Sequence, residues 1–270
     1  MHERTQDAMS YVRTYGKPDL FITFTCNPTW KEMKEELFHG QSAKDRRDLV
    51  ARVFRQKIIK MMNLIKKCII FGSIRCDMYT IEWQKRGLPH AHILLWLNNK
   101  IHSNQIDLII SAELPDPNTD PVLFHIIKKT MVHGPCGNLN ANSPCMVNGK
   151  CIKRHPRQFV NETQTGIDGY PLYKRRKPGH GGVSTKIKVN NGIEVDIDNR
   201  WIVPYCPLLS KAFEAHINVE FCNFIKSIKY VCKYVNKCSD ATMYALQNPN
   251  LNDEVTTYQC GRYISSSEAF

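Results

Sequence analysis

Two histidines separated by one residue are the side chains in this sequence best suited to chemistry. His90 and His92 flank Ala91 inside an apolar stretch, residues 88–97, that predicts a buried strand. Because side chains alternate along a strand, both imidazoles lie on one face, where they can bind one divalent cation. The ordinary alternative is a pair of core histidines satisfied by hydrogen bonds.

A carboxylate is expected to face the two histidines across a hairpin. Residues 78–84 form a second expected strand, and the connecting loop Lys85-Arg86-Gly87 ends in glycine, as in a type I turn closed by a left-handed residue. Counting outward from this loop places Glu82 opposite His90, so Glu82 is the predicted third ligand. Gln84, on the same face, is the reserve candidate.

Two tyrosines lie four residues apart in the last expected helix, residues 223–237. Tyr230 and Tyr234 share one helical face and can therefore point into one site. Such a pair usually serves packing, and a phenol with a pKa of about 10 is a poor nucleophile without a metal or a base. Four lysines surround the pair and suit a phosphate group, namely Lys226, Lys229, Lys233 and Lys237.

Thiols and imidazoles gather in a segment rich in glycine, proline and asparagine, from His133 to His155. Cys136, Cys145 and Cys151 are soft ligands that suit a structural Zn²⁺ ion, and the segment has few apolar residues of its own to order it. Free cysteines in a loop are the alternative. The fourth ligand is one of the two histidines.

The charge balance favours a polyanionic partner. The 270 residues include 37 Lys and Arg against 25 Asp and Glu, a net charge of +12, which is typical of proteins that bind nucleic acid. No uninterrupted apolar run reaches the ~18 residues of a membrane span, so no membrane partner is expected. The basic residues expected to contact DNA are Lys85, Arg86, Lys174, Arg175, Arg176, Lys229 and Lys237.

The elements that must position these residues form an α+β pattern. We predict a central antiparallel sheet that carries His90 and His92, with helices packed on it. Strands are expected at residues 20–25, 78–84, 88–97, 183–189, 193–197 and 216–221, and helices at 43–67, 121–132 and 223–237. The expected divisions are the N-terminal part of this domain at 1–132, an inserted zinc lobe at 133–156, and a basic loop region with the C-terminal part at 157–270.

Several stretches resemble Helitron transposases. Phe-Ile-Thr-Phe-Thr at residues 21–25, then residues 82–92, then the Tyr230/Tyr234 pair occur in the order found in rolling-circle replication initiators. The resemblance implies the Rep-type HUH endonuclease segment, called helicase-like, with a fold of HUH type. It favours His133 over His155 as the zinc ligand. The further matching stretches are Tyr15–Asp19, His133–Gly137, Asn199–Trp201, Ala215–Glu220 and Gly261–Ser265.

What the resemblance implies is a single-stranded DNA endonuclease and strand transferase of rolling-circle transposition, acting in the nucleus. His90, His92 and a third polar side chain would hold Mg²⁺ or Mn²⁺, and Tyr230 or Tyr234 would attack the phosphodiester to leave a 5′-phosphotyrosine, with Lys233 near the phosphate. The zinc lobe would be structural, without a role in cleavage. The implied partners are single-stranded DNA at transposon ends and a helicase domain further along the same polypeptide.

Two other functions compete with this one. A catalytically silent DNA-binding remnant of a transposon would keep the fold and the zinc site, and a zinc-dependent RNA-binding module would bind without cleaving. The sequence contains no G-x-x-x-x-G-K-[ST] phosphate loop, so it is not expected to hydrolyse ATP.

Overall fold

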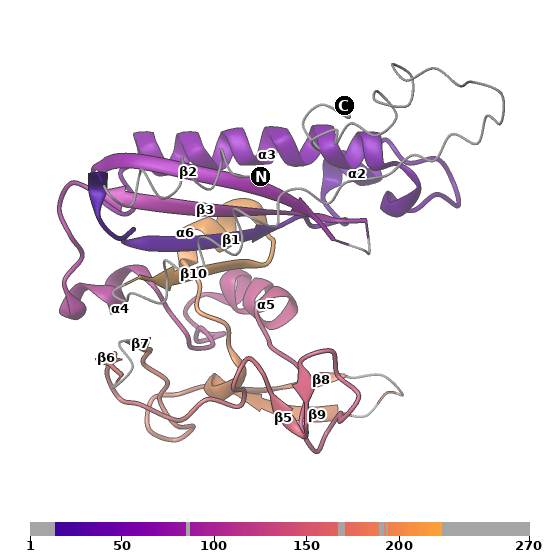
Figure 1. The fold of residues 1–270 in the computed structure, drawn as a ribbon. Coiled ribbons are helices and arrows are strands. Elements are labelled where there is room, and N and C mark those ends of the chain that lie inside the picture. The colour runs from indigo at the N-terminus through magenta and orange to yellow at the C-terminus, as the bar shows by residue number, and fades with distance from the viewer. Residues whose placement is uncertain (1–13, 85–86, 167–170, 189–191, 193, 223–270) are drawn as a thin grey trace, which may run out of the picture.

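The protein is built on one antiparallel sheet of four strands. The computed structural model describes residues 14–84, 87–166, 171–188, 192 and 194–222. Within it the strand order is β10-β1-β3-β2, and every neighbouring pair is antiparallel (Figure 1). The four strands are β1 (Leu20–Thr25), β2 (Ile74–Trp83), β3 (Pro89–Leu97) and β10 (Ile217–Phe221).

Helices and short ribbons flank this sheet. The helices are α2 (Lys31–Lys34), α3 (Arg47–Lys67), α4 (Ile106–Ile109), α5 (Pro121–Thr130) and α6 (Pro207–Phe213), with 3-10 turns η1 (Ala43–Asp45), η2 (Ser103–Gln105) and η3 (Asn199–Trp201). The two-stranded ribbons pair β4 (Met146–Val147) with β5 (Lys150–Cys151), β6 (Gln164–Thr165) with β7 (Pro171–Leu172), and β8 (Ser184–Lys188) with β9 (Glu194–Asp198). The described part of the chain is therefore α+β, as predicted. None of its helices is long and apolar enough to cross a membrane.

Alternation along the strands decides which side chains enter the main core. In β1, Leu20, Ile22 and Phe24 are fully buried, whereas the residues between them are half-buried. β3 lies between β1 and β2 and is apolar almost throughout, as a strand with neighbours on both sides and both faces covered requires. The turn from β2 into β3 ends at Gly87, whose φ of +80° is the left-handed conformation that the sequence predicted.

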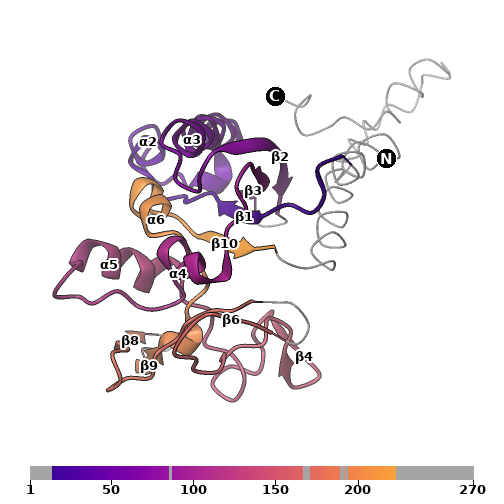
Figure 2. The same ribbon diagram turned by 90° about the vertical axis from the view of Figure 1, so that its left-hand side faces the viewer.

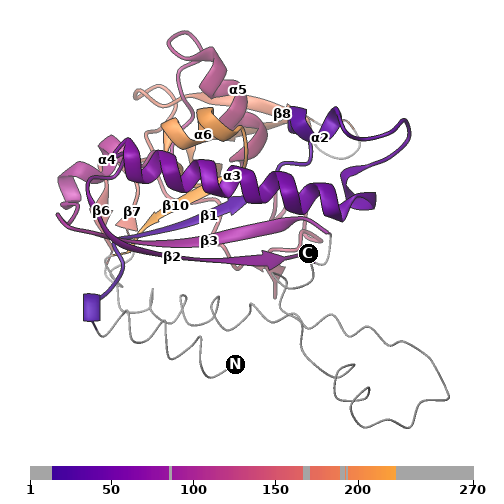
Figure 3. The ribbon, with the colours of Figure 1, turned by 90° about the horizontal axis from the view of Figure 1, so that it is seen from above.

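Helices cover one face of the sheet. α3 presents apolar side chains at steps of three or four to the strands, and these side chains join the main core. α2, α3 and α6 all lie on this side of the sheet (Figures 2 and 3). The Trp30 indole donates a hydrogen bond of 2.7 Å to the carbonyl of Phe213, which ties the start of α2 to the end of α6.

A second apolar core lies beside β10 and organises residues 114–205. Ile127 and Met131, from α5 and the residue after it, pack in this core with Trp201, Ile202 and Tyr205. Cys136 is buried in the same cluster, with the other two cysteines of its segment packed against it. The segment 133–156 therefore rests on a core that residues before and after it supply.

Arg175 is not at the surface, which corrects the prediction that it contacts DNA. Its side chain is only 4% exposed, and one guanidinium nitrogen donates to the carbonyls of Ala112, Asn199 and Ile202 at 2.9, 2.6 and 2.7 Å. Ala112 belongs to the main core, whereas Ile202 belongs to the second core. Arg175 thus crosslinks the two cores, since hydrogen bonds from a charged donor are stronger than neutral ones.

Replacing Arg175 by Met should destabilise the fold strongly. The apolar side chain fills similar space but leaves three carbonyls without their shared donor, and each lost hydrogen bond to a charged group costs roughly 1.5–3 kcal/mol. We expect the free energy of unfolding to fall by at least about 3 kcal/mol in urea titrations followed by circular dichroism.

The control is the neighbouring Lys177→Met. Lys177 is exposed, so this variant should stay within about 0.5 kcal/mol of the original protein. Equal stability of the two variants would contradict a crosslinking role for Arg175.

Candidate metal centres

One cross-strand row of polar side chains lies on the sheet face opposite the helices. The β2–β3 register pairs Glu82 with His90, as the hairpin count predicted, and pairs Thr80 with His92. On the other side of β3, Thr25 pairs with His90. Because paired residues point to the same face of a sheet, the two imidazoles share that face with Glu82 and the threonines.

Hydroxyl groups of β1 hold one nitrogen of each imidazole. Thr23 Oγ1 lies 3.2 Å from Nδ1 of His92, and Thr25 Oγ1 lies 3.4 Å from Nδ1 of His90. The Nε2 atom of each ring is thereby left for another partner. For His92 that partner is Glu82, whose Oε2 lies 3.3 Å from Nε2.

This spacing matches a shared cation. Ligand atoms about 2.1 Å from one ion are about 3.0–3.4 Å apart at tetrahedral or octahedral angles, which brackets the distance between His92 and Glu82. Gln84, the reserve candidate, is exposed just beyond the end of β2. Glu82 is therefore the better placed of the two side chains.

The surroundings of His90 favour a neutral imidazole, and those of His92 hold its ring in place. His92 is 7% exposed and stacks on the Phe21 ring, with a centroid separation of 5.8 Å. Burial, with smaller contributions from His92 and His216, lowers the pKa of His90 to about 4. A neutral imidazole offers the lone pair that metal binding requires.

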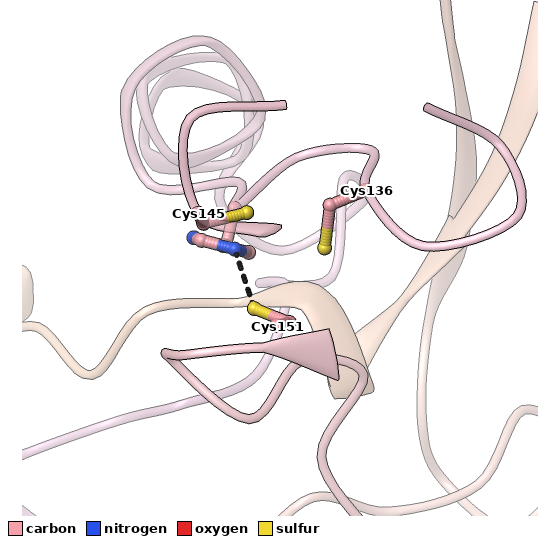
Figure 4. Close-up of side chains that lie close together, drawn as sticks. Cys136, Cys145 and Cys151 are labelled. Atoms are coloured by element: carbon pink, nitrogen blue, oxygen red, sulfur yellow. Dashed lines mark hydrogen bonds between the residues drawn. The ribbon is translucent and has the colours of Figure 1, made fainter. Parts of the chain in front are cut away.

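A second cluster of ligand atoms lies in the lobe beside the sheet. Among the residues that the structure describes, one nitrogen or sulfur atom from each of His133, Cys136, Cys145 and Cys151 lies within 4.8 Å of the others. The three sulfurs point toward one another (Figure 4), and Cys151 Sγ is 3.4 Å from His133 Nε2. These four residues are the set that the sequence predicted, and they could hold a metal such as zinc.

The β4–β5 hairpin brings Cys151 to this cluster. Its register pairs Met146 with Cys151 and Val147 with Lys150, and positive φ angles of 50° and 72° at Asn148 and Gly149 close the turn. Asn-Gly is the sequence that this type of tight turn favours, because both residues tolerate the left-handed conformation.

His155 supports the cluster from outside it. Its ring stacks on His133 with centroids 4.2 Å apart, and its Nδ1 donates to the carbonyl of Arg200 at 3.1 Å. Burial, followed by the neighbouring His133, lowers the pKa of His155 to about 3. The alternate ligand of the sequence prediction therefore orients the His133 ring by stacking on it.

The chemistry of the thiols also suits a cation. Burial, followed by the hydrogen bonds of Cys136 with the Cys145 and Cys151 thiols, raises the pKa of Cys136 to about 12. Ionising the buried Cys136 thiol by itself is therefore costly, whereas a bound divalent cation would deprotonate it.

A comparison with known families covers the first site. Residues 1–95 match the family described as the Helitron helicase-like domain at the N-terminus. This segment, 95 of the 270 residues, is similar to that domain. It contains β1, α3, β2 and most of β3, and with them Glu82 and both histidines. No curated protein matches the chain.

The Helitron-like segment and the cysteine lobe are joined through His216, which the sequence analysis did not single out. The Thr25 amide donates to the His216 carbonyl at 2.9 Å, so His216 extends the row that contains Thr25 and His90. Its Nδ1 donates to the carbonyl of Thr130 at 2.8 Å, three residues before His133. The sequence signal that could have identified His216 is the resemblance of the stretch Ala215–Glu220 to Helitron transposases.

The other predicted site residues either lie outside the described residues or belong to the run at 174–176. Tyr230, Lys233, Tyr234, Lys229 and Lys237 lie outside the described residues, as do Lys85 and Arg86. Lys174 is half-buried. Arg176 forms an ion pair with Glu113 at 2.6 Å, so the run at 174–176 is not an unpaired basic patch.

Removing the lobe's cysteines one at a time tests the second cluster. Purified protein should carry about one zinc ion per chain, and Cys151→Ser should lose most of it because a closed site needs four ligands. The thermal midpoint should fall with the metal, since the binding free energy contributes to folding. Elemental analysis and calorimetry measure both quantities.

Cys68→Ser is the matched control, because Cys68 is exposed and lies at the end of α3. This variant should keep its zinc and its thermal midpoint. A purified protein without zinc, or one that loses zinc equally in both variants, would reject the cluster as a metal site.

Proposed function

We propose that this protein is a metal-dependent single-stranded DNA endonuclease and strand transferase of Helitron transposition. The observation that carries the proposal is the row on the sheet face opposite the helices, where His90, His92 and Glu82 share one face and Glu82 lies 3.3 Å from His92, within a Helitron-like segment. Rolling-circle transposition requires a nick at a defined strand, and the row offers ligands suited to activating a phosphodiester.

The donor set fits Mn²⁺ or Mg²⁺. Two imidazoles and one carboxylate suit a divalent first-row metal, and the fixed Nδ1 contacts leave each Nε2 as the ligand atom. A cation held there would polarise the scissile phosphodiester and offset its developing negative charge. Glu82 would hold the cation against His92, while Thr23 and Thr25 would keep the rings in the ligating orientation.

Tyr230 and Tyr234 are the proposed nucleophiles. The phenol oxygen of one would bond to phosphorus as the bond from phosphorus to the 3′ oxygen breaks, leaving a 5′-phosphotyrosine and a free 3′-OH. The phenol gives up its proton and the leaving 3′ oxygen gains one. Lys233, between the two tyrosines in sequence, would pair with the phosphate charge.

Two tyrosines allow strand exchange. One hydroxyl can remain bonded to a DNA 5′ end while the second attacks another phosphodiester, so the energy of the broken bond is retained in the phosphotyrosine.

We further propose that residues 1–132 and 157–270 together form an HUH-type nuclease domain around a zinc lobe at 133–156. The zinc ion would be structural. A helicase on the same polypeptide would supply strand separation in the nucleus.

Thr23 and Thr25 are testable as positioning residues. Replacing Thr23 by Val keeps the side-chain shape but removes the group that holds Nδ1 of His92, and loss of such outer contacts typically costs about 10–100-fold in metal affinity. We expect Thr23→Val to weaken Mn²⁺ binding at least about tenfold in calorimetric titrations of protein whose zinc content is unchanged.

Thr23→Ser restores a hydroxyl and should restore most of the affinity. A purely packing role would give the opposite order, because Val preserves the shape better than Ser. Equal Mn²⁺ affinity in all three proteins would contradict a role for Thr23 in positioning the His92 ring.

The nucleophile is tested by removing hydroxyls. The double variant Tyr230→Phe, Tyr234→Phe should bind single-stranded DNA normally and form no covalent adduct with Mn²⁺ present, because Phe preserves packing and lacks the attacking oxygen. Denaturing gels of labelled oligonucleotides detect the adduct. Each single variant should retain some cleavage, or reveal that one position dominates.

Tyr79→Phe is the control, since Tyr79 is a surface residue of β2 with 47% exposure. Adduct in this variant and in the original protein, with none in the double variant, supports the mechanism. DNA binding without any adduct in the original protein would instead favour a silent DNA-binding remnant. Adduct persisting in the double variant would place the nucleophile elsewhere.

A further inference from the structure

The outer face of the β4–β5 hairpin is unusually apolar for a surface. Val147 and Ile152 are 52% and 59% exposed, although β-branched side chains are ordinarily buried in sheets. The β4–β5 register explains this exposure. Met146 and Cys151 form the pair that faces the second core and the cluster of ligand atoms, so Val147, Lys150 and Ile152 are turned outward.

The same stretch of the sequence is strongly basic. Residues 121–161 contain no aspartate or glutamate, whereas the whole chain has 25. Lys150 and Lys153 are exposed on and just after the hairpin. The six basic residues of this stretch are Lys128, Lys129, Lys150, Lys153, Arg154 and Arg157. Exposed lysines in a stretch without acidic residues favour a polyanionic partner with phosphate groups.

The hairpin lies on the same side of the molecule as the sheet face opposite the helices (Figure 2). In Figure 2, α3, α5 and α6 lie to the left, and β4 projects to the right, below the sheet. The lobe is tied to the row of the sheet by the hydrogen bond from His216 to Thr130. A strand engaged at His90 and His92 could therefore continue toward the hairpin.

We propose that the outer face of the β4–β5 hairpin binds single-stranded DNA, with Lys150 and Lys153 on phosphates and Val147 and Ile152 against unstacked bases. The proposal rests on the proposed function for its choice of nucleic acid. A single strand exposes base faces that apolar side chains can cover, whereas a duplex conceals them. The cluster of three cysteines and His133 would act here by fixing the hairpin that presents these four side chains.

The test measures binding of a fluorescein-labelled dT20 oligonucleotide by anisotropy over a range of salt concentrations, with full-length protein. Each phosphate contact on a single strand contributes about 0.7 to the slope of log affinity against log salt. Lys150→Gln, Lys153→Gln should therefore weaken binding and reduce the slope by about 1.4. Val147→Ser, Ile152→Ser should weaken binding at every salt concentration with the slope unchanged.

The control removes the same charge from the helix-covered side. Lys60 and Lys67 are exposed on α3, and the Lys60→Gln, Lys67→Gln variant should keep the affinity and slope of the original protein. Zinc content of all variants verifies that the lobe is intact. Unchanged binding by both hairpin variants, or equal loss in the α3 control, would overturn the proposal.

Two further arms separate this inference from the proposed function. Adduct formation is scored with the same oligonucleotide, so a protein that forms no adduct but loses dT20 binding in the hairpin variants would refute the nuclease and retain the hairpin surface. A hairpin-dependent preference for U20 RNA or for duplex DNA over dT20 would refute single-stranded DNA as the occupant.

Discussion

The register of three neighbouring strands is the constraint on which the candidate nuclease site depends. His90 and His92 lie on the sheet face opposite the helices only because β1 and β2 both pair with β3 in the observed alignment. A slip of one residue in β3 would exchange the two faces and direct both imidazoles into the helix-covered core. The buried alternation of β1 and the left-handed Gly87 at the β2–β3 turn oppose that slip, so apolar packing and turn geometry fix where the polar chemistry lies.

The second core extends this order to the cysteine lobe. Met131 follows α5 directly, its sulfur accepts from the Ile217 amide at the start of β10, and His133 begins the ligand cluster two residues later. The Val203 amide in turn donates to the Met131 carbonyl. A few consecutive residues therefore connect the edge of the sheet to the candidate zinc site, which makes the lobe a continuation of the sheet's scaffold.

Local patterns in the sequence were sufficient for much of the architecture. The bounds of β1, most of the helix predicted at 43–67 and observed at 47–67, and the pairing of Glu82 with His90 all follow from periodicity or from a three-residue turn. The threonine contacts to Nδ1 could not be derived, because they require the pairing of β1 with β3 across a long separation in sequence. Arg175 was misassigned for a related reason: its three acceptor carbonyls come from distant segments, and a basic residue in a loop gives no sign of them.

The pairing of β1 with β10 also bears on how fast the sheet can fold. The two strands adjoin in space but lie near opposite ends of the described chain, with the second core between them in sequence. Closing so long a loop is slow, and contacts of high sequence separation form late in folding. During synthesis, β1 emerges long before its partner and exposes one row of unpaired backbone groups, the kind of edge that recruits foreign strands. Docking of the second core beside that edge would bring β10 into position and cover the unpaired groups of β1.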